Sequence, residues 1–208
     1  MQHKQIRMLQ DNLQNSRLAT HECISLARRE KIDILALQEP YNHLNKQSDT
    51  YVIPNVSGIQ AVSCSKKRFY AAICVLNPKL KVLKMVQFTN EFQVICEITS
   101  CKRAFVVDSI YFAPRNKIDS DLEFLSQAAD TVRGAQQIFC FDANAKPNVW
   151  FSGTEDGRGE ALNEFLLEKD LFVVNKAGNA KTFSGPNGES NIAVTFVSGN
   201  ALPNICVC

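Results

Sequence analysis

Short apolar runs that alternate with polar positions dominate this chain. In residues 6–13 the alternation places Met8, Gln10 and Asn12 on one face, which predicts a strand. Further strands are predicted at 33–37, 51–53, 60–63, 70–76, 82–88, 92–98, 104–112, 137–141, 171–174 and 192–197. The strands between 51 and 112 follow one another directly, so we expect a meander.

Helical periodicity is confined to the segments 16–31, 120–133 and 159–169. In the second, Ser120-x-x-Glu123 predicts a capping box, and the apolar stripe is formed by Leu122, Leu125, Ala129 and Val132. Residues 182–191 carry the turn-forming sequence Gly-Pro-Asn-Gly. Many strands with few helices predict an α+β domain, in which two sheets pack face to face and the helices lie outside.

Composition supports one folded domain in a reducing compartment. The 208 residues are 45% hydrophobic and 21% charged, which excludes a disordered tail, a coiled coil and a collagen-like fibre. Of the eight cysteines, Cys74, Cys96 and Cys140 lie inside apolar runs, and we expect free, buried thiols. Alternatively, Cys206 and Cys208 could form half of a metal site, but the other ligands would have to come from distant parts of the chain. No run approaches the about 18 apolar residues of a membrane span.

Charge is unevenly placed, although the formal net charge is only +2. Residues 1–104 hold 15 Lys and Arg against 8 Asp and Glu, whereas residues 105–208 hold 8 against 13. The cluster Lys66-Lys67-Arg68 suits a phosphate backbone, but lysines on an edge strand also prevent unwanted sheet pairing. Charges scattered over solvated faces are the simpler interpretation, so charge alone identifies no partner.

Polar residues close several of the apolar strands. Asn12 and Glu39 end the first two, Tyr111 ends the strand 104–112, and Asp142 and Asn144 follow the strand 137–141. Side chains at the rim of a sheet can bind a cation or activate water. Each also has a structural interpretation: Asn12 as a turn former, Glu39 as a solvated residue before proline, Tyr111 as a core aromatic, and the last pair as a cap.

These segments together resemble the ordered motifs of the endonuclease/exonuclease/phosphatase superfamily. The resemblance rests on residues 10–14, 38–41, 109–111, 142–145 and 190–195, with 12–20 and 142–146 the most specific. Arg158-Gly159, Asn175 and Thr182-Phe183 follow the same pattern. Within the superfamily the chain resembles the apurinic-endonuclease-like domain of non-LTR retrotransposon polyproteins, in particular insect elements that insert at fixed ribosomal or telomeric sites. The resemblance implies a DNase I-like, four-layer α/β sandwich of two mainly antiparallel sheets.

The resemblance also implies an activity and roles for the strand-end residues. The family nicks one strand of a DNA target with a divalent cation, Mg²⁺ or Mn²⁺, to prime reverse transcription. Glu39 would be the principal metal ligand, with Asn12 beside it bonding to the metal's waters or to Asp142. Asp142 would align and deprotonate the attacking water, Asn144 would hold that water or a phosphate oxygen, and Tyr111 would donate to the developing phosphorane.

The expected partners are double-stranded DNA and the reverse transcriptase domain of the same polyprotein. We expect the domain to be a monomer that acts in the nucleus and does not bind a membrane. The DNA-binding candidates are Arg17, Arg115, Lys146, Arg158 and Thr182, and the loops 42–50 and 176–190 are candidates for reaching into a groove. The target sequence cannot be derived from these residues.

Two departures from the family pattern weaken the expected activity. Ala193 stands where the family has an aspartate that orients the catalytic histidine, and the family's terminal Ser-Asp-His motif is absent. We therefore expect residues 1–208 to be a single domain that lacks its last strand. His43 is an alternative candidate for the role of the missing histidine. The chain should bind DNA and a cation but nick poorly; a catalytically silent DNA-binding module and a phosphatase of the same superfamily are the alternatives.

Overall fold

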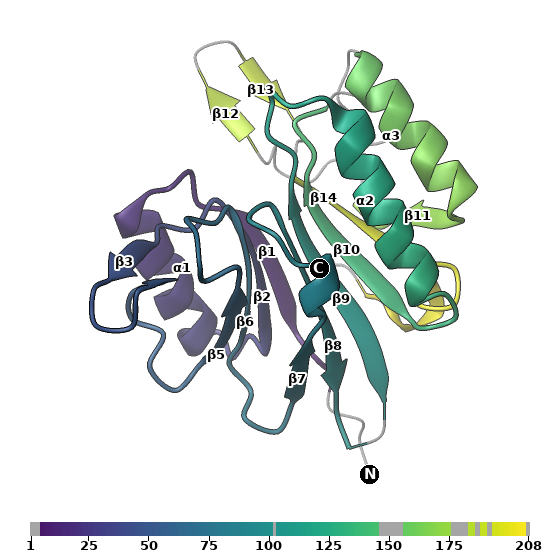
Figure 1. Cartoon of the computed structure of the whole chain (residues 1–208). Coiled ribbons are helices and arrows are strands. Elements are labelled where there is room, and N and C mark those ends of the chain that lie inside the picture. Colours follow the sequence, from purple (N-terminus) through teal and green to yellow (C-terminus); the bar gives the residue numbers. More distant parts are fainter. Residues whose placement is uncertain are drawn as a thin grey trace.

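Two β-sheets lie face to face at the centre of the computed structural model (Figure 1). The structure describes residues 5–101, 103–145, 156–175 and 193–206, together with the backbone of 183–185 and 188–190. The four-stranded sheet has the order β1 (Met8–Asn12), β2 (Ile34–Gln38), β6 (Ala71–Val75) and β5 (Gln60–Ser63). The six-stranded sheet has the order β11 (Leu171–Val173), β14 (Ala193–Ser198), β10 (Gln137–Asp142), β9 (Ala104–Tyr111), β8 (Gln93–Thr99) and β7 (Lys81–Lys84).

Pairing in these sheets is mainly antiparallel. The exceptions among the described ladders are β1 with β2 and β9 with β10, which are parallel. Two short hairpins lie outside the sheets: β3 (His43–Asn45) with β4 (Thr50–Val52), and β12 (Phe183–Gly185) with β13 (Gly188–Ser190). The second hairpin falls where turn chemistry is predicted.

Helices cover the outer face of each sheet, so central strands such as β2 and β6 are buried at every position. Helix α1 (Arg17–Arg29) packs Ile24 and Ala27 against one face of the four-stranded sheet. Helices α2 (Ile118–Thr131) and α3 (Gly157–Glu168) lie on the other side of the molecule and pack on the six-stranded sheet around Phe139 and Phe141 (Figure 1). Between the sheets, Ile73 and Val94 belong to a third apolar layer. The α+β four-layer sandwich is confirmed.

The described elements depart from the predictions at several places. The strands between 51 and 112 do not form one meander, because β5 and β6 pair in one sheet and β7, β8 and β9 in the other. The predicted strand 82–88 ends at Lys84, and Val86–Phe88 forms a 3-10 helix, η1. The capping box is wrong, because α2 begins at Ile118 with Lys117 at its N-cap, and the Ser120 hydroxyl donates to the Lys117 carbonyl at 3.2 Å. Burial of Ile118 in the core beneath α2 outweighs the local capping preference.

Cys74, Cys96 and Cys140 are fully buried, as predicted, and the seven cysteines in the described part of the chain are free. Burial raises the pKa of the Cys74 and Cys96 thiols to about 12, so these thiols behave as small apolar side chains. None of the helices in the described residues has the length and apolar character needed to cross a bilayer.

Candidate active site at the meeting point of the two sheets

The carboxyl ends of four strands meet at one rim of the sandwich. Asn12 is the register partner of Gln38 in the parallel pair β1–β2, and Asp142 is the partner of Tyr111 in the parallel pair β9–β10. One side chain joins the two sheets, because the Asn12 amide donates to Glu39 Oε1 at 3.3 Å and to Asp142 Oδ2. The rim therefore brings together three of the residues that the sequence singled out.

Glu39 is held in place through its side chain and its backbone. Asn15 Nδ2 donates to Glu39 Oε2 at 2.6 Å, and the Glu39 amide donates to the Tyr70 carbonyl at 2.8 Å. Glu39 and Asn144 have φ values of 45° and 42°, in the left-handed region that side chains rarely adopt. Such strain persists only where the surrounding contacts impose it, and here it occurs at both sides of the rim.

Asp142 is buried, which raises the pKa of its carboxyl to about 7. The negative charge of Glu39 adds to this increase, whereas the hydrogen bond from Asn12 and the cation of Arg158 oppose it. A carboxyl whose pKa lies near neutrality can accept or release a proton at physiological pH. A bound cation would lower that pKa and favour the carboxylate.

The Tyr111 hydroxyl remains a proton donor at this rim. Burial is the main cause that raises its pKa well above the usual value, and the charges of Glu39 and Asp142 and a hydrogen bond to Glu39 contribute further. Its ring stacks on Tyr70 at 5.7 Å between centroids and on Phe92 at 6.5 Å. The phenol is therefore fixed beside the carboxylates.

Asn144 and Arg158 bind the backbone at the residues directly after β10. The Asn144 backbone amide donates to Asp142 Oδ1 at 3.3 Å, and its side-chain amide donates to the Phe112 carbonyl at 3.1 Å. The half-buried Arg158 guanidinium donates to the carbonyls of Asn144 and Asn116 at 3.0 and 2.7 Å, and to the carbonyl of Ala143. Arg158 thus has a structural role that the sequence pattern did not predict.

Of the other predicted DNA-binding residues, two are exposed and two lie outside the described residues. Arg17 is exposed at the first residue of α1, and Arg115 is exposed in the turn before α2. Lys146 and Thr182 lie outside the described residues. His43 is exposed in the β3–β4 hairpin and stacks on Tyr41 at 6.2 Å.

Ala193 lies directly opposite Asp142 in the antiparallel β10–β14 ladder. Its carbonyl accepts a hydrogen bond from Asn175 Nδ2 at 3.3 Å, and Asn175 Oδ1 accepts from the Thr195 amide at 2.8 Å. Directly opposed residues point to the same face of a sheet with Cβ atoms about 5 Å apart. A carboxylate at position 193 would therefore be a direct neighbour of Asp142.

A buried polar bridge behind the rim was missed by the sequence interpretation. Gln10 Nε2 donates to the Phe141 carbonyl at 2.7 Å, and the Thr195 hydroxyl donates to Gln10 Oε1 at 2.7 Å. Beside it, Gln38 Nε2 donates to Ser109 Oγ at 2.9 Å. The alternation of side chains along a strand could have revealed this bridge, because Gln10 shares a strand face with Asn12, and Ser109 shares one with Tyr111.

The donor set at the rim fits a hard divalent cation. Mg²⁺ binds through one or two carboxylates and keeps several waters, and Glu39 and Asp142 supply two carboxylates with amides beside them. In the described part of the chain, no group of three or more His, Cys, Asp and Glu side chains could hold a metal. A site of this kind would thus depend on few protein ligands.

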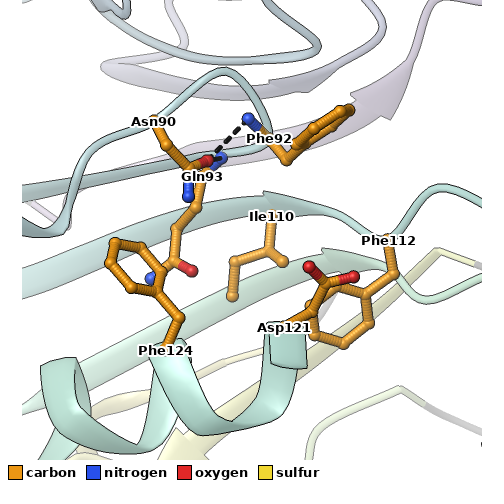
Figure 2. A pocket seen from close by; sticks show the side chains of 7 residues that line it. All are labelled: Asn90, Phe92, Gln93, Ile110, Phe112, Asp121 and Phe124. Carbon is orange, nitrogen blue, oxygen red and sulfur yellow. Dashed lines mark hydrogen bonds between the residues drawn. The ribbon is translucent and has the colours of Figure 1, made fainter. Parts of the chain in front are cut away.

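A small cavity near the rim is too small for a substrate. It lies between α2 and the strands β8 and β9, where Asp121 and Phe124 face Gln93 and Ile110 (Figure 2). Its volume of about 10 Å³ is close to that of a single water. Its upper edge is ordered by Asn90 Oδ1, which accepts from the amides of Phe92 and Gln93.

Comparisons with known proteins agree with this geometry. A family model described as "Endonuclease-reverse transcriptase" matches residues 105–208, half of the chain. A Pol polyprotein of the type-1 retrotransposable element R1 from Bradysia coprophila is 32% identical over 136 residues. That match covers 62% of this chain but only 14% of the polyprotein.

Solved structures extend the similarity over nearly the whole chain. The endonuclease domain of TRAS1, a telomere-specific non-LTR retrotransposon, is 30% identical with a TM-score of 0.82, and the match covers 95% of this chain and 87% of that one. An AP endonuclease from Archaeoglobus fulgidus shares the fold at 16% identity, with a TM-score of 0.64 and coverage of 98% and 90%. The chain therefore belongs to the endonuclease–reverse transcriptase family, as an endonuclease domain of the endonuclease/exonuclease/phosphatase superfamily of the kind found in non-LTR retrotransposons.

Proposed function

We propose that this domain binds double-stranded DNA and hydrolyses one phosphodiester bond in one strand, with Mg²⁺ or Mn²⁺ as cofactor. The observation that carries the proposal is the Asn12 amide, which links Glu39 on one sheet to Asp142 on the other. In this proposal Glu39, as the carboxylate that would bind the cation, lies beside a carboxyl suited to proton transfer. The pairing matches the needs of phosphodiester cleavage, namely charge neutralisation and an activated water.

Each residue at the rim has a distinct task in this proposal. Glu39 would hold the cation, which when bound neutralises charge on the scissile phosphate. Asp142, whose pKa is about 7, would take the proton of the attacking water. Tyr111, which stays protonated, would donate a hydrogen bond to a phosphate oxygen as negative charge develops there. Asn144 would orient the water.

The relatives supply the wider setting. Because the matched relative is a retrotransposon Pol polyprotein, we infer that a reverse transcriptase belongs to the same polyprotein as this domain. The nick would then provide a 3′-hydroxyl that primes reverse transcription at a nuclear target site. Nicking at fixed positions in an end-labelled duplex supports a site-specific element, and cleavage at random positions contradicts it.

Ala193 favours a second candidate function, a DNA-binding module with little activity. The residue occupies the ladder position opposite Asp142 where the family pattern has an aspartate. In the family pattern that aspartate orients the catalytic histidine, so a chain with Ala193 lacks one positioned acid–base pair. Loss of a positioned acid–base group typically costs about 10² to 10⁴ in rate.

A plasmid-nicking assay separates the two candidates. Ala193→Asp is made in a chain extended by the family's terminal Ser-Asp-His motif, because the aspartate acts through that histidine. This variant, the same variant with Glu39→Gln, and the unaltered chain are incubated with supercoiled DNA in Mg²⁺, with EDTA as control. We expect slow nicking by the unaltered chain, at least about tenfold faster nicking by the extended Ala193→Asp variant, and none when Glu39→Gln is added. Rapid nicking by the unaltered chain would refute its impairment. DNA binding without nicking in every variant would establish the silent module, and hydrolysis of a phosphoinositide alone would indicate a phosphatase.

A further inference from the structure

Arg68, an exposed cation immediately before β6, is tied to the candidate active site. Its guanidinium donates to Asn15 Oδ1 at 3.1 Å and lies 5.9 Å from the centroid of the Tyr70 ring. The neighbouring Phe69 is fully buried, which anchors this segment in the core. Arg68 is therefore held on both sides although its charged group faces solvent.

Short paths connect Arg68 to Glu39 and to Tyr111. Asn15, which accepts from Arg68, donates through Nδ2 to Glu39 Oε2 at 2.6 Å. The Asn15 amide also donates to the Glu39 carbonyl at 2.8 Å. Tyr70 stacks on Tyr111, so the ring beneath the guanidinium touches the phenol at the rim. The position of Arg68 is consequently set by the same residues that hold Glu39.

The two acidic side chains at the rim would repel a DNA phosphate, and Arg68 is a cation placed where it can offset this repulsion. A DNA phosphate that approaches Glu39 and Asp142 meets two acidic groups, and a nearby cation would offset the repulsion. Arg158 is half-buried, with its guanidinium bonded to three backbone carbonyls. A guanidinium has five N–H donors, and within the described residues Arg68 makes one hydrogen bond, to Asn15 Oδ1. Its remaining donors can reach outward to a phosphate.

We propose that Arg68 binds a backbone phosphate of the DNA strand directly beside the Glu39 metal position. The inference rests on the proposed function, because it needs DNA at this rim. The sequence showed Arg68 only as one of three cations in a basic cluster, whereas the structure distinguishes it from its neighbours by its contacts with Asn15 and Tyr70. The hydrogen bond to Asn15 and the Tyr70 ring orient the guanidinium before DNA arrives, which lowers the entropic cost of forming the contact.

The test measures binding of the 208-residue chain to a fluorescent duplex in Mg²⁺ over a range of salt concentrations. Arg68→Met should weaken binding about tenfold at low salt and reduce the slope of log K against log salt by about 0.9, the value for one phosphate contact. Arg68→Gln keeps a donor for Asn15 but lacks the charge, and it should show the same decrease in the slope of log K against log salt. Arg68→Lys should retain most of the slope while binding more weakly.

Lys67→Met is the matched control. Lys67 is adjacent and exposed, but its Nζ lies 3.5 Å from Glu91 Oε1, so it already has an acidic partner. We expect a slope change less than half that of Arg68→Met. Thermal unfolding of every variant verifies that the fold is retained, and Arg68→Gln decides the outcome if Arg68→Met unfolds.

The possible outcomes separate this inference from the proposed function. If the unaltered chain fails to bind duplex DNA, the proposed function fails and this inference fails with it. If the chain binds and both neutral Arg68 variants keep the full slope, only the role of Arg68 is wrong. Equal slope losses for Lys67→Met and Arg68→Met would also overturn it, because the effect would then reflect net charge.

Discussion

At the scale of single residues, two buried carboxyls in neighbouring strands have different environments. Asp142 reaches the rim, where Asn12 and the Asn144 amide bind its oxygens. Asp108, in the middle of β9, is 1% exposed and accepts one hydrogen bond, from Gln93 Nε2 at 3.1 Å, while its Oδ1 has no partner in the described residues. Burial therefore raises the pKa of Asp108 well above its usual value.

We predict that Asp108→Asn stabilises the fold increasingly as pH rises. The native pKa of Asp108 exceeds its unfolded pKa of about 3.9, so the native state binds the extra proton. The stability of the unaltered chain therefore falls as pH rises from about 4 through the native pKa, by about 1.4 kcal/mol per pH unit for this group. Asparagine cannot ionise and lacks this loss.

Urea unfolding of both proteins between pH 4 and pH 9 provides the measurement. The exposed Asp130 serves as the control, because hydrogen bonds from Lys169 and Arg133 lower its pKa. The native contribution of this carboxylate is lost only as pH falls below its unfolded pKa of about 3.9, so Asp130→Asn should differ from the unaltered chain by a constant amount over this pH range. A constant difference between Asp108→Asn and the unaltered chain at all pH values would contradict the prediction.

At the scale of elements, the apolar stripe predicted α2 while the capping motif misplaced its start. Leu122, Leu125 and Ala129 are buried as the periodicity required. The helix nevertheless begins at Ile118, and its N-cap residue Lys117 makes no side-chain capping bond. The first backbone amides of α2 consequently lack the acceptor that serine, threonine or aspartate supplies at this position.

We predict that Lys117→Ser stabilises the protein by about 1 kcal/mol, since the serine hydroxyl can accept from an amide in the first turn and a cation near the helix N-terminus is removed. Lys117→Ala separates these effects, because it removes the cation without providing a cap, and it should change stability less. The midpoint of urea unfolding measures both. An alanine variant as stable as the serine variant would show that capping contributes nothing here.

At the scale of the whole molecule, an apolar layer and a polar bridge join the two sheets. Ile34 and Ile73 of one sheet share the intervening layer with Val94 and Val107 of the other. Closer to the rim, Gln38 donates to Ser109 across the interface, and Ser109 donates to the Leu37 carbonyl at 3.0 Å. The rim exists only while the sheets stay in this alignment.

We predict that Ser109→Ala lowers the free energy of unfolding by about 1–3 kcal/mol, because the buried Gln38 amide loses one of its two acceptors and keeps only the Cys140 carbonyl. Both sheets should still unfold in one transition, seen as coincident curves from far-UV circular dichroism and tyrosine fluorescence. The exposed Ser48→Ala should stay within about 0.5 kcal/mol of the unaltered chain. Two separate transitions would show that the sheets fold independently.

Local patterns predicted a large part of the fold and the polar residues that end the strands at the rim. Alternation located the central strands and marked Asn12, Tyr111 and Asp142 as polar residues at strand ends, and the structure brings Asn12 to Asp142. The sequence named Arg68 only as part of a basic cluster and missed Asn15, because neither residue follows a strand period. They lie in loops, and their contacts to each other and to Glu39 span 53 and 24 residues. Arg158 was predicted to bind a DNA phosphate, and the structure shows that its guanidinium also donates hydrogen bonds to backbone carbonyls.

The sequence by itself determined the elements and the polar residues that end them, because strand and helix periods act over a few neighbouring residues. Only the tertiary structure decided that β1 and β2 in one sheet end beside β9 and β10 in the other. The contact between Asn12 and Asp142 joins residues 130 positions apart. Its geometry depends on how the two apolar faces pack, and that packing is a property of the whole core.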